Sequence, residues 1–501
     1  MSQWAGLFRL VRYWFTTLFM NVSTTPFKTV LGLFVAATLL LTGCKKDPVE
    51  INPTGTAPDA IVNDWILQNM KDYYYWTDKL PANPDKSLTP DKFFGSLLYK
   101  FNATTNPEGD RFSFIRQSAT ELQALLSGES KTTGMDFDLL LRTQGATDVI
   151  GVVLYVLPGS PADKAGVKRN DIFYSVNGTS LTTTNYSQLL FGDVATLNFG
   201  FVTVQNGALV NSSATKSISP VVFQENPVYQ DSVYTDGDRK IGYLVYNQFV
   251  PGPNGSTTAM YDNQVDAIFA KFKQQGINEL VLDLRYNPGG SVASSAKLAS
   301  LIVKGVAGQS KVPFVRTAWN PQITTALTND PKYGTDFFYN YFETKANNVG
   351  SQISRLYVLT TDRTASASEL IINGLRPFMP VNTIGSATAG KNVGSITLTD
   401  TKNKANPWGM QPITFRSYNK NNESNYFTGF APTVSIDEPY GALYPLGDTR
   451  DALLASAISH MKGQTTGGRR GVMTKQISVG SSIARKAAGS NMFVDMPALE
   501  K

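Results

Sequence analysis

The chain has 501 residues, of which 42% are hydrophobic and 17% charged, as expected for a folded protein of several domains. Its net charge of +6 comes from the two ends, since residues 1–44 carry +3 and residues 465–501 carry +4, which leaves −1 on the rest. A nucleic-acid partner needs concentrated basic surface, so this balance argues against one. The single cysteine, Cys44, excludes an intrachain disulfide.

The first 44 residues have the pattern of an export signal. A lysine precedes an apolar run that is too short to span a membrane comfortably, and the run ends in the letters LTGC. This ending resembles a bacterial lipobox, which implies that residues 1–44 are a lipoprotein signal peptide and that Cys44 carries lipid. The long stretch before the apolar run leaves open whether translation starts at Met1 or at Met20. Residues 45–58 then read as a polar tether.

Two smaller domains are predicted next along the chain. Residues 59–130 are expected to form a helical cap, because apolar residues recur near helical spacing in AIVNDWILQNMKDYYYWTD and LTPDKFFGSLLYKF. Residues 131–220 change to strand and turn patterns, and the letters GSPADKAGVKRNDIFYSVNG resemble a PDZ domain. The resemblance implies that a peptide C-terminus is captured by adding a strand to the sheet edge. The residues expected in the carboxylate-binding loop are Gly134, Met135, Asp136 and Phe137.

Residues 221–465 alternate between strands and helices, which is the pattern of an α/β domain. Strand patterns occur in KIGYLVYNQF, ELVLDLRYN, RLYVLTT and VNTIGSA. Helical patterns occur in YDNQVDAIFAKFKQQG, SVASSAKLASLIV, SASELIINGLR and RDALLASAISHM. Residues 466–501 are rich in glycine, serine and basic residues and are predicted to be a disordered tail.

The helix that starts in RTASASELIIN suggests a nucleophile. Ser366 lies there between Thr364 and Ser368, and a serine that attacks a substrate must give its proton to a base. The only histidine, His460, falls on a late helix and is interpreted as a surface residue. A lysine can act as the base if burial or a nearby cation keeps it neutral. Lys391, in the glycine-rich loop after the strand VNTIGSA, is the candidate.

Ser366 and Lys391 each follow a strand of the predicted sheet. The carboxyl ends of neighbouring strands share one crevice, so the two side chains can meet if RLYVLTT and VNTIGSA are neighbours. A third strand leads into DLRYNPGG, whose glycines let backbone amides face a substrate. Gly289 or Gly290 is therefore expected to stabilise a developing oxyanion, together with the amide of Ala367 at a helix N-terminus.

The same residues also have structural interpretations. Ser366 and Ser368 are of a type that caps helices, and a lysine in a glycine loop is usually solvated. Asp283 and Arg285 are expected to form a structural ion pair. The loop GSATAGKN has the glycine and lysine spacing of a phosphate loop, but it lacks the hydroxyl residue that would bind magnesium, which argues against a nucleotide. We expect neither a metal nor another cofactor.

The letters LVLDLRYNPGG, TASASELI and GKNVGS occur in this order behind the PDZ-like region and the helical cap. Together they resemble the carboxyl-terminal processing peptidases, which are S41-type serine peptidases with a PDZ domain. The resemblance implies an α/β fold, with a crotonase-like/ClpP-like catalytic domain, an inserted PDZ-like domain and an N-terminal helical cap. It also implies that Ser366 is the nucleophile and Lys391 the base, with Gly289, Gly290 and Ala367 as oxyanion donors.

Two positions depart from the family pattern. Some members orient the lysine with a glutamine four positions later, where this chain has Ser395. Some have an aspartate in the helix after the nucleophile, where this chain has Pro377. Ser395 and Glu369 are the suggested partners that orient Lys391.

The resulting hypothesis is a lipid-anchored serine endopeptidase in the envelope of a Gram-negative-type bacterium, on the periplasmic face or at the outer membrane or cell surface. Its expected partners are protein or peptide substrates with exposed C-termini and the membrane that holds its lipidated N-terminus. One alternative is a catalytically inactive PDZ-bearing adaptor on the same scaffold, which the two departures favour. A crotonase-like acyl-CoA enzyme is the other alternative, and the export signal argues against it because CoA is a cytoplasmic cofactor.

Overall fold

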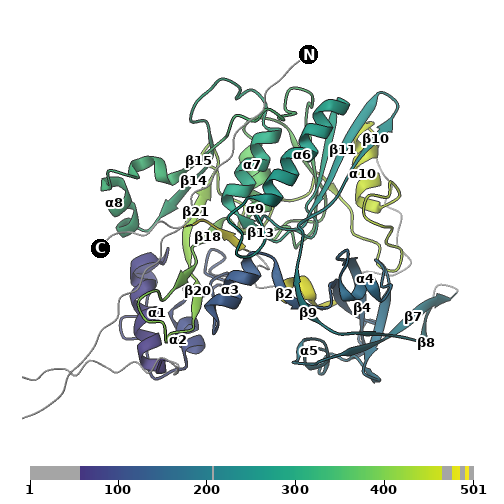
Figure 1. Ribbon diagram of the computed structural model, residues 1–501, viewed down its shortest axis with the longest axis horizontal. Coiled ribbons are helices and arrows are strands. Elements are labelled where there is room, and N and C mark those ends of the chain that lie inside the picture. The colour runs from purple at the N-terminus through teal and green to yellow at the C-terminus, as the bar shows by residue number, and fades with distance from the viewer. Residues whose placement is uncertain (1–56, 206–207, 465–476, 486–490, 496–501) are drawn as a thin grey trace, which may run out of the picture. The chain divides into compact units, whose positions relative to one another are not determined.

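The computed structural model describes the residues 57–205, 208–464, 477–485 and 491–495 (Figure 1). All of them belong to the compact unit Asn52–Lys501. The expected signal peptide, the lipid-bearing Cys44 and almost all of the tether lie outside the described residues. Within the described ranges, no helix is both long and apolar enough to cross a membrane.

The N-terminal region is mainly helical, as its periodicity predicts. Its elements are α1 (Asp59–Tyr73), η1 (Thr77–Lys79), α2 (Pro90–Leu97), β1 (Phe114–Arg116) and α3 (Ala119–Leu126). The buried faces of α1 and α2 pack on each other through Ile66 and Phe93, and the same apolar cluster includes Val393 of the α/β domain. The cap therefore rests directly beside the loop that carries Lys391.

The PDZ-like region is an antiparallel sheet with two short helices. Its elements are β2 (Glu129–Thr132), β3 (Met135–Leu141), β4 (Val149–Val156), α4 (Pro161–Lys164), β5 (Ile172–Val176), β6 (Thr179–Ser180), α5 (Tyr186–Phe191), β7 (Leu197–Gln205), β8 (Ala208–Ile218) and β9 (Val221–Gln224). The sheet order is β23-β3-β4-β5-β7-β8, so a strand from far along the chain, β23 (Ser478–Ser481), forms one edge. Phe137, Phe173 and Phe199 meet edge to face in the core.

The central sheet of the α/β domain has the order β10-β11-β12-β16-β17-β22, and all its pairs from β11 onward are parallel. Its strands are β10 (Val228–Asp236), β11 (Arg239–Tyr246), β12 (Glu279–Asp283), β16 (Leu356–Thr360), β17 (Val381–Gly385) and β22 (Val434–Ser435). The strands expected to lead into Ser366 and Lys391 are thus direct neighbours, as the shared crevice requires. The predicted α/β class is confirmed.

Helices cover both faces of this sheet (Figure 1). They are α6 (Met260–Gln275), α7 (Val292–Ile302), α9 (Ala367–Leu375) and α10 (Ala452–Met461). Leu280 and Leu282 of β12 join the apolar cluster of α6, α7 and α9, whereas Val281 joins that of α10, because side chains alternate along a strand. α6 ends at Gln275, and its C-cap residue, Gly276, has the left-handed conformation typical of a glycine at this position.

A second mixed sheet lies beside the carboxyl ends of the central strands. Its order is β13-β24-β18-β21-β14-β15, with β13 (Gly289–Ser291), β24 (Asn491–Phe493), β18 (Val393–Ser395), β21 (Ile413–Tyr418), β14 (Pro313–Trp319) and β15 (Tyr339–Tyr341). Nearby are α8 (Pro321–Asn329), η2 (Gly334–Phe338), and β19 (Leu398–Thr399) and β20 (Gly409–Gln411), which extend β1 of the cap. This sheet carries both the glycines and the lysine loop.

The expectation of a disordered tail over residues 466–501 is wrong for two described segments. Residues 477–485 form β23 and the helix α11 (Ser482–Arg485) against the PDZ-like sheet, and residues 491–495 contain β24. These strands could not be predicted from the polar composition of the segments, because their hydrogen bonds are made to strands distant in sequence.

Candidate active site

Three hydroxyl residues alternate at the start of α9, and only one hydroxyl is left uncommitted. Thr364 Oγ1 donates to the carbonyl of Leu284 over 2.8 Å, and Ser368 Oγ donates to the carbonyl of Asn287 over 3.0 Å. Ser366 Oγ is buried and has no hydrogen-bond partner within the described part of the chain. Two hydroxyls therefore fix the helix start, and the third is free for chemistry.

The backbone at Ser366 forms a sharp turn between β16 and α9. Its φ of 65° and ψ of −117° are unusual for a residue with a side chain and cost about 1–3 kcal/mol. The surrounding contacts impose this conformation, since Ala365 N donates to the carbonyl of Asn287 and Ser366 N to Glu369 Oε2. Ser366 is the N-cap of α9 and forms a capping box with Glu369, so the capping interpretation of Ser366 is also supported.

Glu369 joins the serine turn to the lysine loop. Its Oε2 accepts hydrogen bonds from the amides of Ser366 and Lys391, each over 2.8 Å. Its Oε1 accepts from Thr388 Oγ1 over 2.6 Å and from the amide of Gly390 over 2.8 Å. Burial raises the pKa of this carboxyl group, while these four donors act in the opposite direction. Glu369 was suggested as a partner of Lys391, and it accepts a hydrogen bond from the backbone amide of Lys391.

Lys391 is fully buried, which is uncommon for a lysine. Burial lowers the pKa of Lys391 to about 7, although the negative charges of Asp110 and Glu369 favour its protonated form. The guanidinium of Arg111 acts in the same direction as burial. Lys391 Nζ also lies 4.9 Å from the ring centre of Phe112, a residue of the cap. A large fraction of this amine is therefore neutral near pH 7, as a general base must be.

The backbone amides of Gly289 and Gly290, the expected oxyanion donors, differ in the hydrogen bonds that they already make. Both have positive φ values, 112° for Gly289 and 132° for Gly290, which a residue with a side chain rarely adopts. The amide of Gly289 already donates to Asn287 Oδ1 over 2.9 Å. The amide of Gly290 and that of Ala367, which as the first residue of α9 has no intrahelical acceptor, are the better-placed pair.

Ser395 does not supply the hydrogen bond that was expected from it. The residue is buried in β18, but its Oγ has no hydrogen-bond partner among the described residues, so it makes none to Lys391. Pro377 follows the end of α9 and offers no polar side chain. The two departures from the family pattern therefore leave Glu369 as the group that fixes the lysine loop.

The residues expected to bind a peptide form the first turn and edge of β3. Gly134 has a φ of 84°, and a Cβ there would lie 2.1 Å from the Cβ of Ser160, so only glycine fits. Met135 and Phe137 line a cavity of 430 Å³ together with Leu190, other apolar residues of the PDZ-like core, and polar residues that include Lys131 and Arg485. Such a cavity suits an apolar peptide side chain.

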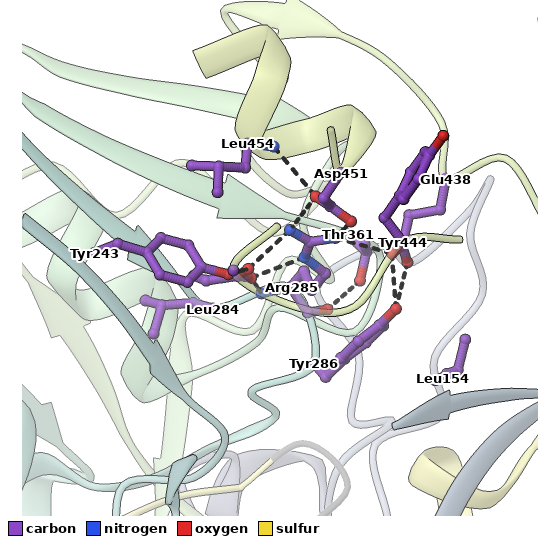
Figure 2. A network of polar contacts seen from close by, with 12 residues as sticks. Leu154, Tyr243, Leu284, Arg285, Tyr286, Thr361, Glu438, Tyr444, Asp451 and Leu454 are labelled. Atoms are coloured by element: carbon purple, nitrogen blue, oxygen red, sulfur yellow. Dashed lines mark hydrogen bonds and ion pairs between the residues drawn. The ribbon is translucent and has the colours of Figure 1, made fainter. Parts of the chain in front are cut away.

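Asp283 and Arg285 form the buried ion pair that the sequence predicts, as part of a larger network (Figure 2). The Arg285 guanidinium also donates to both oxygens of Asp451, over 2.7 and 3.0 Å, and to Glu438 over 3.0 Å. Arg169 of the PDZ-like region reaches the same Glu438 over 2.7 Å. No local pattern points to Asp451, Glu438 or Arg169, because the network joins parts of the chain far apart in sequence.

Comparisons with known proteins agree with this architecture. The model of the peptidase S41 N-terminal domain matches residues 62–114, that of a PDZ domain 152–197, and that of peptidase family S41 240–436. A carboxyl-terminal-processing protease of Picosynechococcus sp. is 26% identical over 279 residues, which are 54% of this chain and 57% of that protein. A "Probable CtpA-like serine protease" of Staphylococcus aureus is 26% identical over 47% of this chain and 41% of its own length.

Among solved structures, a candidate S41 protease from Bacteroides fragilis superposes with a TM-score of 0.63 at 26% identity, covering 80% of this chain and 97% of its own. The family models, the relatives and this structure define an S41-type peptidase scaffold with a PDZ domain. Residues 240–436 match peptidase family S41, and the chain is similar to the carboxyl-terminal processing proteases. It spans about half the length of the curated relatives it matches.

Proposed function

We propose that this protein is a serine endopeptidase of the bacterial envelope that binds protein C-termini through its PDZ domain and cleaves by a Ser366–Lys391 dyad. One arrangement carries the proposal. The buried hydroxyl of Ser366, which has no hydrogen-bond partner in the described part of the chain, and the buried amine of Lys391, with a pKa of about 7, belong to backbone segments that share one carboxylate oxygen of Glu369.

In the first step Ser366 Oγ attacks the carbonyl carbon of the scissile peptide bond, and its proton passes to neutral Lys391 Nζ. The amides of Gly290 and Ala367 would stabilise the oxyanion that forms, a contribution typically worth about 10²- to 10³-fold in rate for each donor. The intermediate then collapses to an acyl-enzyme as protonated Lys391 gives its proton to the leaving amine. Lys391 next activates water, which releases the second product and restores the hydroxyl of Ser366.

The PDZ domain supports a preference for exposed C-termini. The cavity beside β3, which has apolar and charged lining residues, is the feature that could hold the end of a peptide, since β23 already pairs with the edge of that strand. The lipobox-like ending at Cys44 supports attachment to an envelope membrane. Both points rest on the resemblance and on sequence chemistry.

The function is tested with an unfolded protein offered in two forms, one with a free apolar C-terminus and one with that carboxylate amidated. The masses of the products give the cleavage sites. We expect cleavage of both forms, faster for the free carboxylate, and none by Ser366→Ala. Equal cleavage rates for the two forms would contradict the proposal that the PDZ domain binds C-termini. A folded wild-type protein that cleaves neither form would support the adaptor alternative.

A further inference from the structure

The strand β24 occupies a slot in the catalytic domain. It lies between β13 and β18 in the second sheet, parallel to both, with Asn491 opposite Gly289 and Phe493 opposite both Ser291 and Ser395. β13 carries the oxyanion glycines, and β18 directly follows the lysine loop (Figure 1). An extended peptide held between these two strands is bound by main-chain hydrogen bonds on both edges, which is a mode of peptide recognition.

The carbonyl oxygen of Asn491 lies against the same glycine, Gly289, as the hydroxyl of Ser366. Asn491 N donates to the carbonyl of Pro288, and in a parallel ladder of this register the Asn491 carbonyl faces the amide of Gly290. A methyl group on Gly289 would lie 2.4 Å from the Asn491 carbonyl oxygen and 2.8 Å from Ser366 Oγ. Both oxygens thus lie against the same side of Gly289, where a scissile carbonyl is expected.

The side chain of Asn491 occupies a closed pocket. It is fully buried, and its Nδ2 donates to Gln411 Oε1 over 2.9 Å. Gln411 is oriented by its own Nε2, which donates to Thr397 Oγ1 over 2.6 Å. This glutamine therefore presents an acceptor to a side-chain amide and would repel a carboxylate in the same place.

A nearby segment, β23, also lies where a bound peptide would be expected. β23 adds to the edge of β3, antiparallel, with Ser478 opposite Leu140 and Ser481 opposite Asp138. Ser482 Oγ accepts from the amide of Phe137, which lies in the expected peptide-binding turn. The chain thus occupies both the peptide edge of the PDZ domain and the slot at Ser366.

We propose that this protein is its own substrate, bound in cis, and that Ser366 cleaves the peptide bond between Asn491 and Met492. The inference rests on the proposed function. Ser366 Oγ forms a bond to the Asn491 carbonyl carbon and gives its proton to Lys391. The carbon–nitrogen bond to Met492 then breaks, and its amine takes that proton. Water finally releases the chain that ends at Asn491.

Cleavage at this bond would open the slot. Met492 is fully buried in the main apolar cluster, so the piece that follows Asn491 holds β24 in place. Its departure frees the edges of β13 and β18 for another peptide, while β23 keeps its place on β3. The uncut protein is accordingly expected to act slowly on other substrates until it has processed itself.

The intact mass of the purified full chain, followed over time at about pH 8, where most of the lysine base is neutral, tests the proposal. We expect loss of the residues after Asn491, at a first-order rate that does not change with protein concentration, and no loss in Ser366→Ala. A chain that digests an unrelated unfolded protein but keeps these residues would overturn self-cleavage alone. A chain that digests neither would overturn both self-cleavage and the proposed function.

Two matched variants test whether the pocket around the side chain of Asn491 selects the cleavage site. Asn491→Asp places a buried charge beside the acceptor Gln411 Oε1 and should slow self-cleavage roughly tenfold or more, because the carboxylate loses water and faces another acceptor. Asp495→Asn makes the reverse exchange at an exposed position of the same segment and should leave the rate unchanged. Equal rates in both variants, or cleavage at another bond in the wild type, would contradict the assignment of Asn491.

Discussion

The backbone amides of Ser366 and Lys391 donate to the same carboxylate oxygen of Glu369, each over 2.8 Å. One buried side chain therefore sets the separation of the Ser366 turn from the Lys391 loop, the proposed nucleophile and base. Ser366 follows β16 and Lys391 follows β17, so the parallel pairing of these strands brings the two segments together and Glu369 fixes their final positions.

Glu369→Gln should impair catalysis without abolishing the fold. The amide of glutamine donates hydrogen bonds where the carboxylate accepts them, so at least one of the loop amides loses its acceptor. We expect kcat for a peptide to fall by roughly 100-fold, the cost of a misplacement of about 1 Å, with little change in KM. Loss of the negative charge should also move the pKa of Lys391, and the acid limb of the pH–rate profile, to lower pH.

The control for that substitution is Glu423→Gln, at an exposed carboxylate near the same end of the domain. Its kcat and pH profile should match those of the wild type. A Glu369→Gln protein with wild-type kcat would show that the shared carboxylate does not position the dyad.

The activity of the wild type should rise with pH through about 7. Lys391 accepts a proton only when neutral, and its pKa is lowered to about 7, so acidification protonates the base and removes activity. The measurement is kcat/KM for a peptide without titratable groups, between about pH 5 and 9, which brackets that pKa. A profile that is flat across this range, or that rises only near the ordinary pKa of lysine, about 10.4, would be incompatible with a buried lysine base.

Lys391→Met should abolish cleavage yet raise thermal stability at neutral pH. The amine has a pKa of about 7 when folded against 10.5 when unfolded, so the unfolded state binds more protons between these values. Wild-type stability therefore rises with pH across this window, and the cost of burying the amine is largest below about pH 7. Unfolding followed by circular dichroism should give the variant a higher Tm at about pH 7, with a smaller advantage at about pH 10.

Lys304→Met, at an exposed lysine, serves as the control and should change neither activity nor the pH dependence of Tm. A Lys391→Met protein whose Tm is lower than that of the wild type at every pH would mean that the ammonium stabilises the fold, which is the opposite of what its lowered pKa requires.

Asp451→Asn should destabilise the catalytic domain strongly. It removes one of the carboxylates around the fully buried Arg285 (Figure 2), and breaking a buried ion pair typically costs about 3–5 kcal/mol. Urea unfolding measures the loss. Asp238→Asn, at an exposed ion pair with Arg239, should leave the midpoint unchanged. Equal midpoints for the two variants would show that the network adds little to stability.

Cys44→Ser should release the protein from membranes. The lipobox-like ending implies that this thiol carries the lipid, and serine cannot be lipidated in the same way. Fractionation of cells that express each form compares the membrane-bound and released amounts. Continued membrane association of the variant would require another anchor.

Much of the site could be predicted from sequence because it lies at the ends of strongly patterned elements. Apolar strands and amphipathic helices placed Ser366 and Lys391 after two strands, and the strands proved to be neighbours. The ion pair of Asp283 and Arg285 was also predicted correctly. In each case local periodicity fixed the element, and the rules of parallel sheets then constrained its neighbours.

The remainder depends on contacts between distant residues. The sequence suggested Glu369 as a partner of Lys391, but only the fold shows that its carboxylate accepts from the backbone amides of both Ser366 and Lys391. The stretch around Asn491 has neither helical nor strand periodicity, so its place in the sheet follows from the open edges of β13 and β18. Likewise, the sequence NPGG does not predict that the amide of Gly289, one expected oxyanion donor, already donates to Asn287 Oδ1.

The central claim is that Ser366 is a nucleophile activated by Lys391, and a fluorophosphonate probe tests it most directly. We predict a single labelled residue, Ser366, identified by peptide mass, with a labelling rate that rises with pH through about 7 and is lost in Lys391→Arg, whose guanidinium cannot accept a proton. Labelling at another residue, or at an equal rate in Lys391→Arg, would contradict the claim.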